Sequence, residues 1–555
     1  MARDKWNSRL TFILASIGSA VGLGNAWRFP GLCAKFGGGA FLLAYVICML
    51  IAGIPLLMME IAVARRTRGG APKAMRGINK HFEAAGWAAT TNAFVIVTYY
   101  AVVFAWCILM AVVSFKFATT NSTVETATTL WQDTIQTTWG TSFAGAGGNI
   151  PLMVVLALVI AWGLIYVCIR NGAASVSKVV KYTVFLPIIM LIILAVRGFV
   201  KNPNLGDALG ALFIPKWQSL GDVNLWVNAM GQVFYSLSIM MAIMFAYGSF
   251  LDAKANIAAD AMIIAFSDLA VSVLSGIVLF TTMYSVGMTT ENMSASGIAT
   301  AFIIYPTAIV QLTSVPWLNA AFGFVFYFML CTLAIDSAFS IVEGVSTAVS
   351  DKFDFNKKKT TKTLTIIAAA ISVIYITGAG VGWLDIVDHW TNAYSMIICG
   401  IMEALAVGWF FKTNKVLDEV NKNTIKWRMP KWWFDTSIKI IAPLALSLFL
   451  VWQLVDLIKS GGRYSQDYSL AAELIGGWLV TIISFSSGLI IKLICKYNKK
   501  LGERVAKVEA KEKSWDDMGK VEDREFAKLE KEEQALETQM QQTLDEIKDE
   551  PVQNA

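Results

Sequence analysis

The chain has 555 residues, of which 56% are hydrophobic and only 15% are charged, and its mean hydropathy is +0.57. This composition is typical of a polytopic membrane protein and excludes a soluble enzyme. The net charge of +6 gives no reason to expect a nucleic-acid partner, and the seven cysteines lack the paired spacing of a disulfide framework or a metal site.

Twelve apolar runs are each near or above the ~20 residues that a helix needs to cross a bilayer. They lie at about residues 10–34, 39–64, 86–117, 150–169, 176–199, 224–251, 258–287, 316–350, 361–379, 384–411, 434–459 and 470–495. We therefore predict an all-α polytopic membrane protein with twelve transmembrane helices, surrounded by the lipid bilayer.

The charges of the connecting loops set the expected orientation. Six Lys and Arg residues follow the second run within residues 65–80, and five Lys residues lie within 351–362, whereas loop 119–149 has neither. Because loops rich in Lys and Arg stay in the cytoplasm, we expect both termini to be cytoplasmic and the chain to lie in the cell membrane, an inner or plasma membrane. The outward loop 288–315 is long enough to fold over the outer mouth as a lid.

The first apolar run contains its own helix breakers. Residues 16–30 read Ser-Ile-Gly-Ser-Ala-Val-Gly-Leu-Gly-Asn-Ala-Trp-Arg-Phe-Pro, so three glycines and two polar side chains lie at or near membrane depth. Lipid offers no hydrogen bonds to a frayed backbone, so such a break persists only where protein or a ligand cavity surrounds it. Freed carbonyls can hold a cation and freed N–H groups an anion, which predicts a binding site inside the membrane.

The pattern Gly-x-x-x-Gly-Leu-Gly-Asn-x-x-Arg-Phe-Pro at 18–30, with Gly-Gly-Gly-Ala-Phe at 37–41 and Gly-Ile-Pro-Leu at 53–56, resembles the neurotransmitter:sodium symporter family, in particular its prokaryotic amino acid transporters. The resemblance implies a transporter domain over 1–495. Two inverted five-helix repeats, spans 1–5 at about 10–199 and spans 6–10 at about 224–411, are followed by spans 11 and 12, and helices 1 and 6 are broken. Ile239-Met240-Met241-Ala242 replaces the family's glycines, which weakens the expected break in span 6.

The resemblance implies two sodium sites. Site 1 maps onto the Ala20 carbonyl, Asn25, Ser236 and Asp268, and site 2 onto the carbonyls of Gly18, Val21 and Leu333 with the side chains of Asp336 and Ser337. A carboxylate in mid-membrane is costly, so we assign both aspartates a functional role.

A chloride site known in some members would fall on Tyr45, Gln232, Ser236, Asp268 and Ser272. Asp268 stands where those relatives have Asn and, when ionised, already supplies the negative charge. Two like charges repel strongly where water is scarce, so we predict that Na⁺ is required and chloride is not.

The substrate site implied by the resemblance comprises Ser19, Ala20, Gly22, Leu23, Gly24, Ile96, Tyr100, Tyr235, Ser236, Ser238, Met241, Ser337 and Ile341. Monoamine transporters of the family have Asp at the position of Gly22, and its absence leaves space for a substrate carboxylate. Backbone carbonyls at the breaks would accept hydrogen bonds from the substrate ammonium. With no full charge in the lining, a neutral α-amino acid is the expected substrate.

Two ion pairs are implied as gates. Arg28 and Asp388 would form the outer pair above Tyr100 and Tyr235, and Arg3 and Asp351 the inner pair beside Trp6. The neighbouring Tyr99 is interpreted as ordinary helix packing. Glu60 and Glu403 match a buried acid pair, which we interpret as structural.

The sequence therefore predicts a sodium-coupled secondary active symporter, not an enzyme, that imports a neutral α-amino acid by alternating access. No Gly-x-x-x-x-Gly-Lys-Ser/Thr motif supports an ATP-driven pump. The alternatives are a non-transporting amino-acid sensor or ligand-gated channel on the same fold, or a symporter for a β- or γ-amino acid or a betaine.

The charged tail, residues 496–555, is predicted to be cytoplasmic. Its apolar residues keep an a/d spacing at Phe526, Leu529, Leu536, Met540 and Ile547. We interpret it as a solvated amphipathic helix. A partner that binds the tail, a coiled coil and a homo-oligomer remain alternatives.

Overall fold

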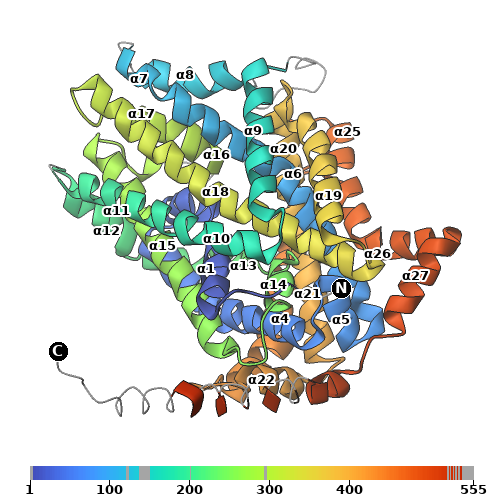
Figure 1. Ribbon diagram of the computed structural model, residues 1–555. Coiled ribbons are helices and arrows are strands. Elements are labelled where there is room, and N and C mark those ends of the chain that lie inside the picture. Colours follow the sequence, from blue (N-terminus) through green and yellow to red (C-terminus); the bar gives the residue numbers. More distant parts are fainter. Residues whose placement is uncertain are drawn as a thin grey trace, which may run out of the picture.

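The computed structural model describes residues 4–119, 124–136, 150–200, 202–292, 297–424 and 426–521, with single positions between 524 and 540. The described chain is built from helices, and none of its segments forms a β-strand. Figure 1 shows a bundle in which α5 (Ala71–Ile78) and α22 (Thr413–Asn421) lie at the lower end. We call this end the terminal face, because the first described residues and the tail helix α27 (Lys499–Glu509) also pack there.

The helices match the twelve predicted runs. Ten continuous stretches are long and apolar enough to span a membrane, and one helix pair bent by 48° makes an eleventh, which is span 1. The twelfth is span 6, which is broken into two short helices. In chain order the spans are α1 (Arg9–Ala20) with α2 (Phe29–Lys35), α3 (Gly39–Cys48) with α4 (Ile54–Thr67), α6 (Glu83–Val113), α9 (Leu152–Ile169), α10 (Ala173–Thr183) with α11 (Phe185–Phe199), α13 (Val223–Ser236) with α14 (Ile243–Gly248), α15 (Ile257–Ser285), α18 (Pro316–Phe353), α19 (Lys357–Ser372), α20 (Gly380–Trp390) with α21 (Met396–Gly408), α23 (Lys431–Thr436) with α24 (Ala442–Lys459), and α25 (Leu470–Glu473) with α26 (Val480–Tyr497).

Short helices cover the opposite face: α7 (Lys116–Thr119), α8 (Val124–Ile135), α12 (Leu205–Phe213), α16 (Gly297–Ala299) and α17 (Tyr305–Ile309). The predicted outer lid packs here through Phe302, whose ring stacks on Trp131 at 5.5 Å and meets Trp27 edge-on at 5.9 Å. Trp27 belongs to the broken span 1, so this loop covers the outer end of the predicted site.

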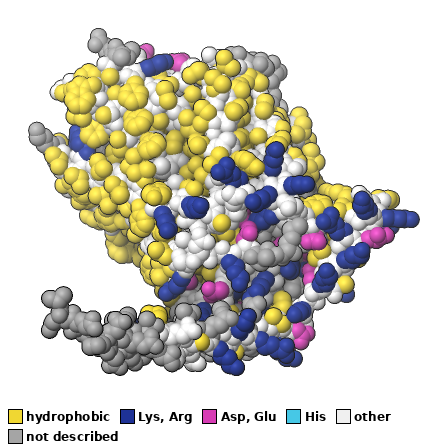
Figure 2. All heavy atoms as spheres, in the orientation of Figure 1, with side chains coloured by type: hydrophobic (Ala, Val, Ile, Leu, Met, Phe, Trp, Pro, Cys, Tyr) yellow, Lys and Arg dark blue, Asp and Glu magenta, His cyan; other side chains and the backbone are white. Residues whose placement is uncertain are grey.

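The outer surface shows where lipid contacts the bundle. Large apolar side chains of the outer spans are exposed in the isolated chain, among them Leu152 at 71% and Ile458 at 74%. Figure 2 shows hydrophobic side chains over most of the upper part of this view and Lys and Arg gathered below them. Such a large apolar surface is stable only in a membrane, so the chain is a multi-pass membrane protein.

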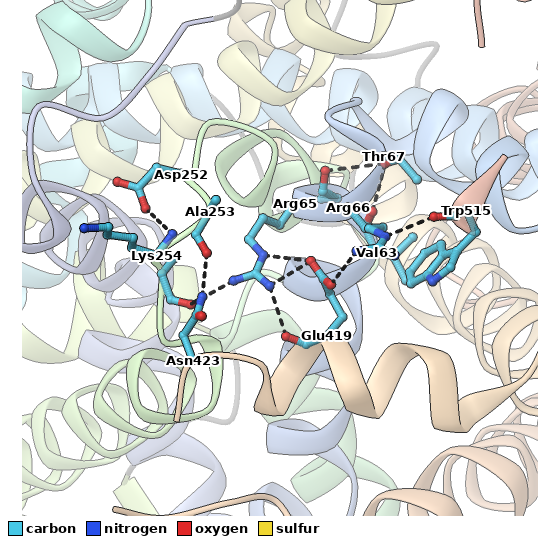
Figure 3. A network of polar contacts seen from close by, with 12 residues as sticks. Val63, Arg65, Arg66, Thr67, Asp252, Ala253, Lys254, Glu419, Asn423 and Trp515 are labelled. Atoms are coloured by element: carbon cyan, nitrogen blue, oxygen red, sulfur yellow. Dashed lines mark hydrogen bonds and ion pairs between the residues drawn. The ribbon is translucent and has the colours of Figure 1, made fainter. Parts of the chain in front are cut away.

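The terminal face is joined by a buried ion-pair network, drawn in Figure 3. The guanidinium of Arg65, at the end of α4, binds Glu419 Oε1 from Nε at 2.9 Å and from Nη2 at 2.7 Å, and donates to the Ala255 carbonyl at 2.8 Å. Arg66 binds the other carboxylate oxygen of Glu419 at 3.2 Å and donates from Nε to the Trp515 carbonyl at 3.1 Å. Through these two guanidiniums, the Glu419 carboxylate links span 2 to the loop before span 7 and to the tail.

The first part of the tail is packed against the bundle. Trp515 is 6% exposed, meets Phe411 edge-on at 5.1 Å and lies under the Arg66 guanidinium. A hydrogen bond from Lys415 lowers the pKa of the exposed Asp516 below its usual range. The solvated helix that we expected applies at most to the region beyond 521: Met540 is 62% exposed, whereas Phe526, Leu529, Leu536 and Ile547 lie outside the described residues.

Candidate functional site

Span 1 breaks where its glycines predict. Helix α1 starts with a capping box, in which the Ser8 hydroxyl accepts from the Thr11 N–H at 3.2 Å and the Thr11 hydroxyl from the Ser8 N–H at 3.1 Å. It ends at Ala20, because Val21 is extended and the Gly22 N–H turns to the Asn25 side-chain oxygen at 2.9 Å. The last carbonyls of α1 are thereby left without helical N–H partners and face the centre of the bundle.

Span 6 is broken despite its missing glycines. Helix α13 ends at Ser236 and α14 begins at Ile243, and between them Ser238, Met240 and Ala242 have φ of +54°, +65° and +61°. These left-handed conformations are costly for residues with a Cβ. The buried carboxylate of Glu60 offsets part of that cost by accepting the Met240 N–H at 2.7 Å. The prediction that helix 6 is broken is therefore confirmed, although the missing glycines had weakened it.

We expect Ala242→Gly to stabilise the protein, because glycine adopts this positive φ without strain. The free energy of unfolding should rise by about 0.5–1 kcal/mol. This is the energy cost of the left-handed conformation for alanine, minus the larger conformational entropy that glycine loses on folding. The thermal unfolding midpoint in detergent measures this rise. Ala246→Gly, four residues further on and inside helix α14, is the matched control and should lower the midpoint. A lower midpoint for Ala242→Gly would contradict the argument.

A small cavity lies between the two breaks. All thirteen residues predicted for the substrate site line it, together with Asn25 and Ile243. The space left free is ≈ 20 Å³, close to what a single water needs. Tyr100 reaches it from α6, where its hydroxyl accepts the Leu23 N–H at 3.4 Å. A Cβ at Gly22 would lie 2.5 Å from the Ser337 hydroxyl, so no side chain fits at that position.

The residues of sodium site 1 lie together, with Asp268 at their centre. This carboxylate is completely buried and accepts hydrogen bonds from Asn25 Nδ2 at 2.7 Å, the Ser236 hydroxyl at 2.6 Å and the Tyr45 hydroxyl at 2.8 Å. Asn25 also donates to Ser272 at 2.8 Å. Asn25 therefore presents its amide N–H to Asp268 in this conformation, and it would have to turn its oxygen inward to bind Na⁺.

Tyr45 and Ser236, which donate hydrogen bonds to Asp268, also belong to the residues mapped for chloride. Tyr45, Ser236 and Ser272 surround Asp268, while Gln232 donates to the Gly24 carbonyl at 3.3 Å. The carboxylate oxygens of Asp268 thus occupy the hydrogen-bonding positions that an anion would need.

Asp336 is the only charged residue predicted for sodium site 2, so its surroundings show whether the site could hold a cation. The carboxylate is 2% exposed, and its Oδ1 has no hydrogen-bond partner among the described residues. A Cβ built on Gly18 would lie 2.6 Å from Oδ2, so Asp336 lies directly against the end of α1. Ser337, the next residue, donates to the Ser19 carbonyl at 3.3 Å. A buried carboxylate with one unpartnered oxygen fits a dehydrated cation. Of the carbonyls predicted for the site, that of Leu333 lies on the same helix as Asp336, and that of Val21 lies directly after the end of α1.

The predicted outer ion pair is absent from this conformation. Asp388 accepts hydrogen bonds from the Tyr99 hydroxyl at 2.7 Å and from Asn392 Nδ2 at 2.8 Å, and no ion pair joins it to Arg28. Arg28 instead lies over the Tyr235 ring, 5.6 Å from its centre. Tyr99 is therefore more than packing, which corrects our interpretation of it. Asn392 was missed although its spacing of four residues from Asp388 is a local signal, whereas Tyr99 is 289 positions away and has no such signal.

The predicted inner ion pair stays a prediction, because one of its two residues is outside the part of the chain that the structure describes. Arg3 lies outside the described residues, and Asp351 accepts the Gly70 N–H at 2.8 Å. Lys357 bridges Asp4 at 2.8 Å and the buried Glu343, and its ammonium lies 4.3 Å from the centre of the Phe250 ring.

Trp6 packs beside this inner cluster, as expected. Its indole N–H donates to the Tyr247 carbonyl at 3.0 Å, and its ring meets that of Phe250 at 5.9 Å. Phe250 therefore contributes an aromatic face to both Lys357 and Trp6.

A bundle of membrane-length helices with two broken spans around a small cavity is typical of a membrane transporter. The chain belongs to the sodium:neurotransmitter symporter family, whose model matches residues 3–132 and 117–500. It is thus a sodium-coupled transporter and not an enzyme.

Similar proteins agree with this assignment. An uncharacterized sodium-dependent transporter of Methanocaldococcus jannaschii is 31% identical over 485 residues, covering 86% of this chain and 95% of the relative. The human sodium- and chloride-dependent GABA transporter 2 is 29% identical over 459 residues, covering 76% of this chain and 75% of the relative. The crystal structure of MhsT in complex with L-phenylalanine has a TM-score of 0.69 at 24% identity, covering 81% of this chain and 99% of MhsT. This likeness confirms the all-α fold with two inverted repeats that the resemblance implied.

Proposed function

We propose that the protein imports a small neutral α-amino acid together with two Na⁺ ions and without chloride. The observation that carries the proposal is the cavity between the two breaks: its lining has no Lys, Arg, Asp or Glu, while backbone groups freed by both breaks face it. In this proposal a substrate carboxylate binds near the Leu23 and Gly24 N–H groups and Tyr100. The substrate ammonium binds carbonyls at the end of α1 and in the break of span 6.

The size of the cavity supports a small substrate. Met241, Ile96 and Ile341 occupy the side-chain end, and only ≈ 20 Å³ stays free. Any amino acid needs more space than this, so the lining must move apart to admit the substrate, and an aromatic side chain requires the largest displacement of these three residues. The phenylalanine named with MhsT therefore supports an amino acid as the substrate class but not that particular side chain.

The ions are proposed from their surroundings. Asp336 with the α1 carbonyls would hold one Na⁺, and Asp268, Ser236, Asn25 and the Ala20 carbonyl the other. The human GABA transporter is named as chloride-dependent, whereas here the Asp268 carboxylate would supply the negative charge from the protein. The basic loops support a cytoplasmic location for both termini and for the tail from residue 496.

Uptake into proteoliposomes tests the proposal. Radiolabelled glycine, alanine, serine, leucine and phenylalanine are offered under an inward Na⁺ gradient, with chloride or gluconate as the anion and K⁺ replacing Na⁺ in a control. We expect concentrative, Na⁺-dependent uptake of the small amino acids that is equal in both anions. Binding without accumulation under every gradient would contradict transport and favour a non-transporting amino-acid sensor.

Replacing Asp336 with Ala is expected to abolish Na⁺-driven uptake, by at least about a hundredfold, since it removes the only charged ligand proposed for sodium site 2. The sodium dependence of substrate binding in detergent should show the same loss. Ser346→Ala, further along α18, removes a hydroxyl that donates to the Glu343 carbonyl at 3.2 Å, outside the cavity, and is the control. Full uptake by Asp336→Ala would exclude this site.

Met241→Ala should broaden the substrate range, because it removes the largest flexible side chain from the cavity. We expect the uptake ratio of phenylalanine to alanine to rise by about tenfold, the usual effect of a few methylene groups in a binding pocket. The neighbouring Met240 packs on Gly400 outside the cavity, so Met240→Ala is the matched control and should leave the ratio unchanged.

A further inference from the structure

A second, larger cavity lies outside the membrane-embedded site, on the terminal face. Its volume is ≈ 950 Å³. One wall is the loop and helix after span 2, residues 65–80, and another is the tail, residues 504–521. Asp4 and the end of span 8 close the remaining side. A volume of this size is within the range of small-molecule sites.

The charge of the lining is strongly one-sided. Eleven Lys and Arg residues line the cavity against five Asp and Glu residues. The two tail glutamates are already used: Glu512 binds Arg76 at 2.8 Å, and Glu509 binds Arg76 at 2.9 Å and Lys352 at 2.7 Å. Asp4 is likewise paired with Lys357.

Four ammonium groups are left over. Lys80 lies on the loop side, and Lys507, Lys511 and Lys513 lie on the tail side. All four are exposed, and none of them has an ion pair or a side-chain hydrogen bond within the described part of the chain. Positive groups held on two facing walls repel each other unless an anion lies between them, and an anion with several charges can bind both walls at once.

We propose that this cavity binds a phosphate-bearing polyanion, which connects the tail to the loop after span 2. Phosphate groups carry close to two charges and several acceptor oxygens each, which suits separate ammonium groups better than a single carboxylate would. The chemistry is the same for a soluble polyphosphate and for the head group of an anionic lipid. Figure 2 shows Lys and Arg gathered just below the apolar surface that lipid would contact.

The position of the site gives binding a consequence for transport. The lining includes Asp4, Phe250 and Lys357, which form the inner cluster beneath the substrate cavity. An anion that holds the tail against the loop would stabilise the conformation in which this face is closed, and it would slow the opening of the inner side.

The test uses the full-length protein in neutral detergent, with sodium tripolyphosphate as the soluble probe and calorimetric titration at low salt as the readout. The variant K507Q/K511Q/K513Q removes the tail ammonium groups. The control K499Q/K500Q/K520Q removes equal charge from exposed tail positions outside the cavity. We expect the first variant to bind about tenfold more weakly than the wild type and the control to bind as the wild type does.

A second experiment, in lipid, distinguishes a lipid head group from a soluble polyphosphate as the bound anion. The thermal midpoint is compared in nanodiscs of phosphatidylcholine with and without phosphatidylglycerol, for the same three proteins. A shift that only the cavity variant loses assigns the site to a lipid head group, while tripolyphosphate binding without such a shift assigns it to a soluble anion. K80Q, on the other wall, should weaken the same binding even if the triple variant folds poorly. Absence of both effects, or equal losses in both triple variants, would overturn the proposal.

Discussion

Exchanging Asp268 for Asn is expected to make uptake depend on chloride. The wild type should transport equally in chloride and in gluconate, whereas Asp268→Asn should transport poorly in gluconate and recover when chloride is added. The carboxylate is the only negative charge among the mapped groups of sodium site 1, so its loss leaves a bound Na⁺ without a counter-charge in a site that excludes water.

The recovery follows from the donors that remain. The hydroxyls of Tyr45 and Ser236, both within 2.8 Å of Asp268 oxygens, stay in place and can donate to an anion instead. Ser272 lies beside them, bonded to Asn25. A coupling of 1–3 kcal/mol between anion and substrate corresponds to a rise of roughly 5- to 150-fold in apparent substrate affinity on adding chloride.

The measurement is Na⁺-driven uptake in proteoliposomes across a chloride titration. Asp260→Asn is the matched control, because Asp260 is also a completely buried carboxylate of α15 but is paired with Arg9 at 2.6 Å, away from the cavity. That variant should lose stability without gaining a chloride requirement. An Asp268→Asn protein that still ignores chloride would show that the carboxylate does not take the place of the anion.

The break in span 1 could be predicted because its cause is local. Gly18, Gly22 and Gly24 lie within one short segment, and glycine weakens a helix wherever it occurs. The cavity residues on α1, α6, α13 and α18 could then be assigned through the resemblance, and the structure brings them together around one space. Their binding of the substrate stays a prediction, which the uptake measurements test.

The break in span 6 could not be predicted in the same way. Its left-handed residues are Ser238, Met240 and Ala242, which favour a helix on local grounds, and the Glu60 carboxylate that holds Met240 is 180 positions away in the chain. Tertiary contacts outweigh helix propensity at this break. The hydrogen bond from the Tyr99 hydroxyl to Asp388 is likewise a tertiary contact, because it joins positions 289 apart.

The docked tail shows the same limit. A hydrophilic segment with mixed charges predicts a solvated helix, and one buried tryptophan in it is a weak signal. Trp515 is held by Arg66 and Phe411, which lie on two other elements of the terminal face. Sequence patterns report the faces of single elements, whereas this anchor depends on where three elements meet.

The buried ion pair of Arg65 with Glu419 should dominate the stability of that face. The side chains are 1% and 3% exposed, and Glu419→Ala would leave the Arg65 guanidinium buried without its carboxylate. Removing one partner of a buried pair costs about 3–5 kcal/mol, several times the cost of losing an exposed pair. We therefore expect a large fall in the thermal midpoint and, because Arg66 binds the same carboxylate, release of the tail from Arg66 as well.

Limited proteolysis and the thermal midpoint together check this prediction. Lys415→Gln is the matched control: it lies on the same helix α22, but its partner Asp516 is 68% exposed, so solvent screens the pair and little stability should be lost. Glu419→Gln keeps the shape and part of the hydrogen bonding and should fall between the two. If Glu419→Ala and Lys415→Gln lowered the midpoint equally, burial would not be what makes the Arg65 pair strong, because burial is the main feature in which the two pairs differ.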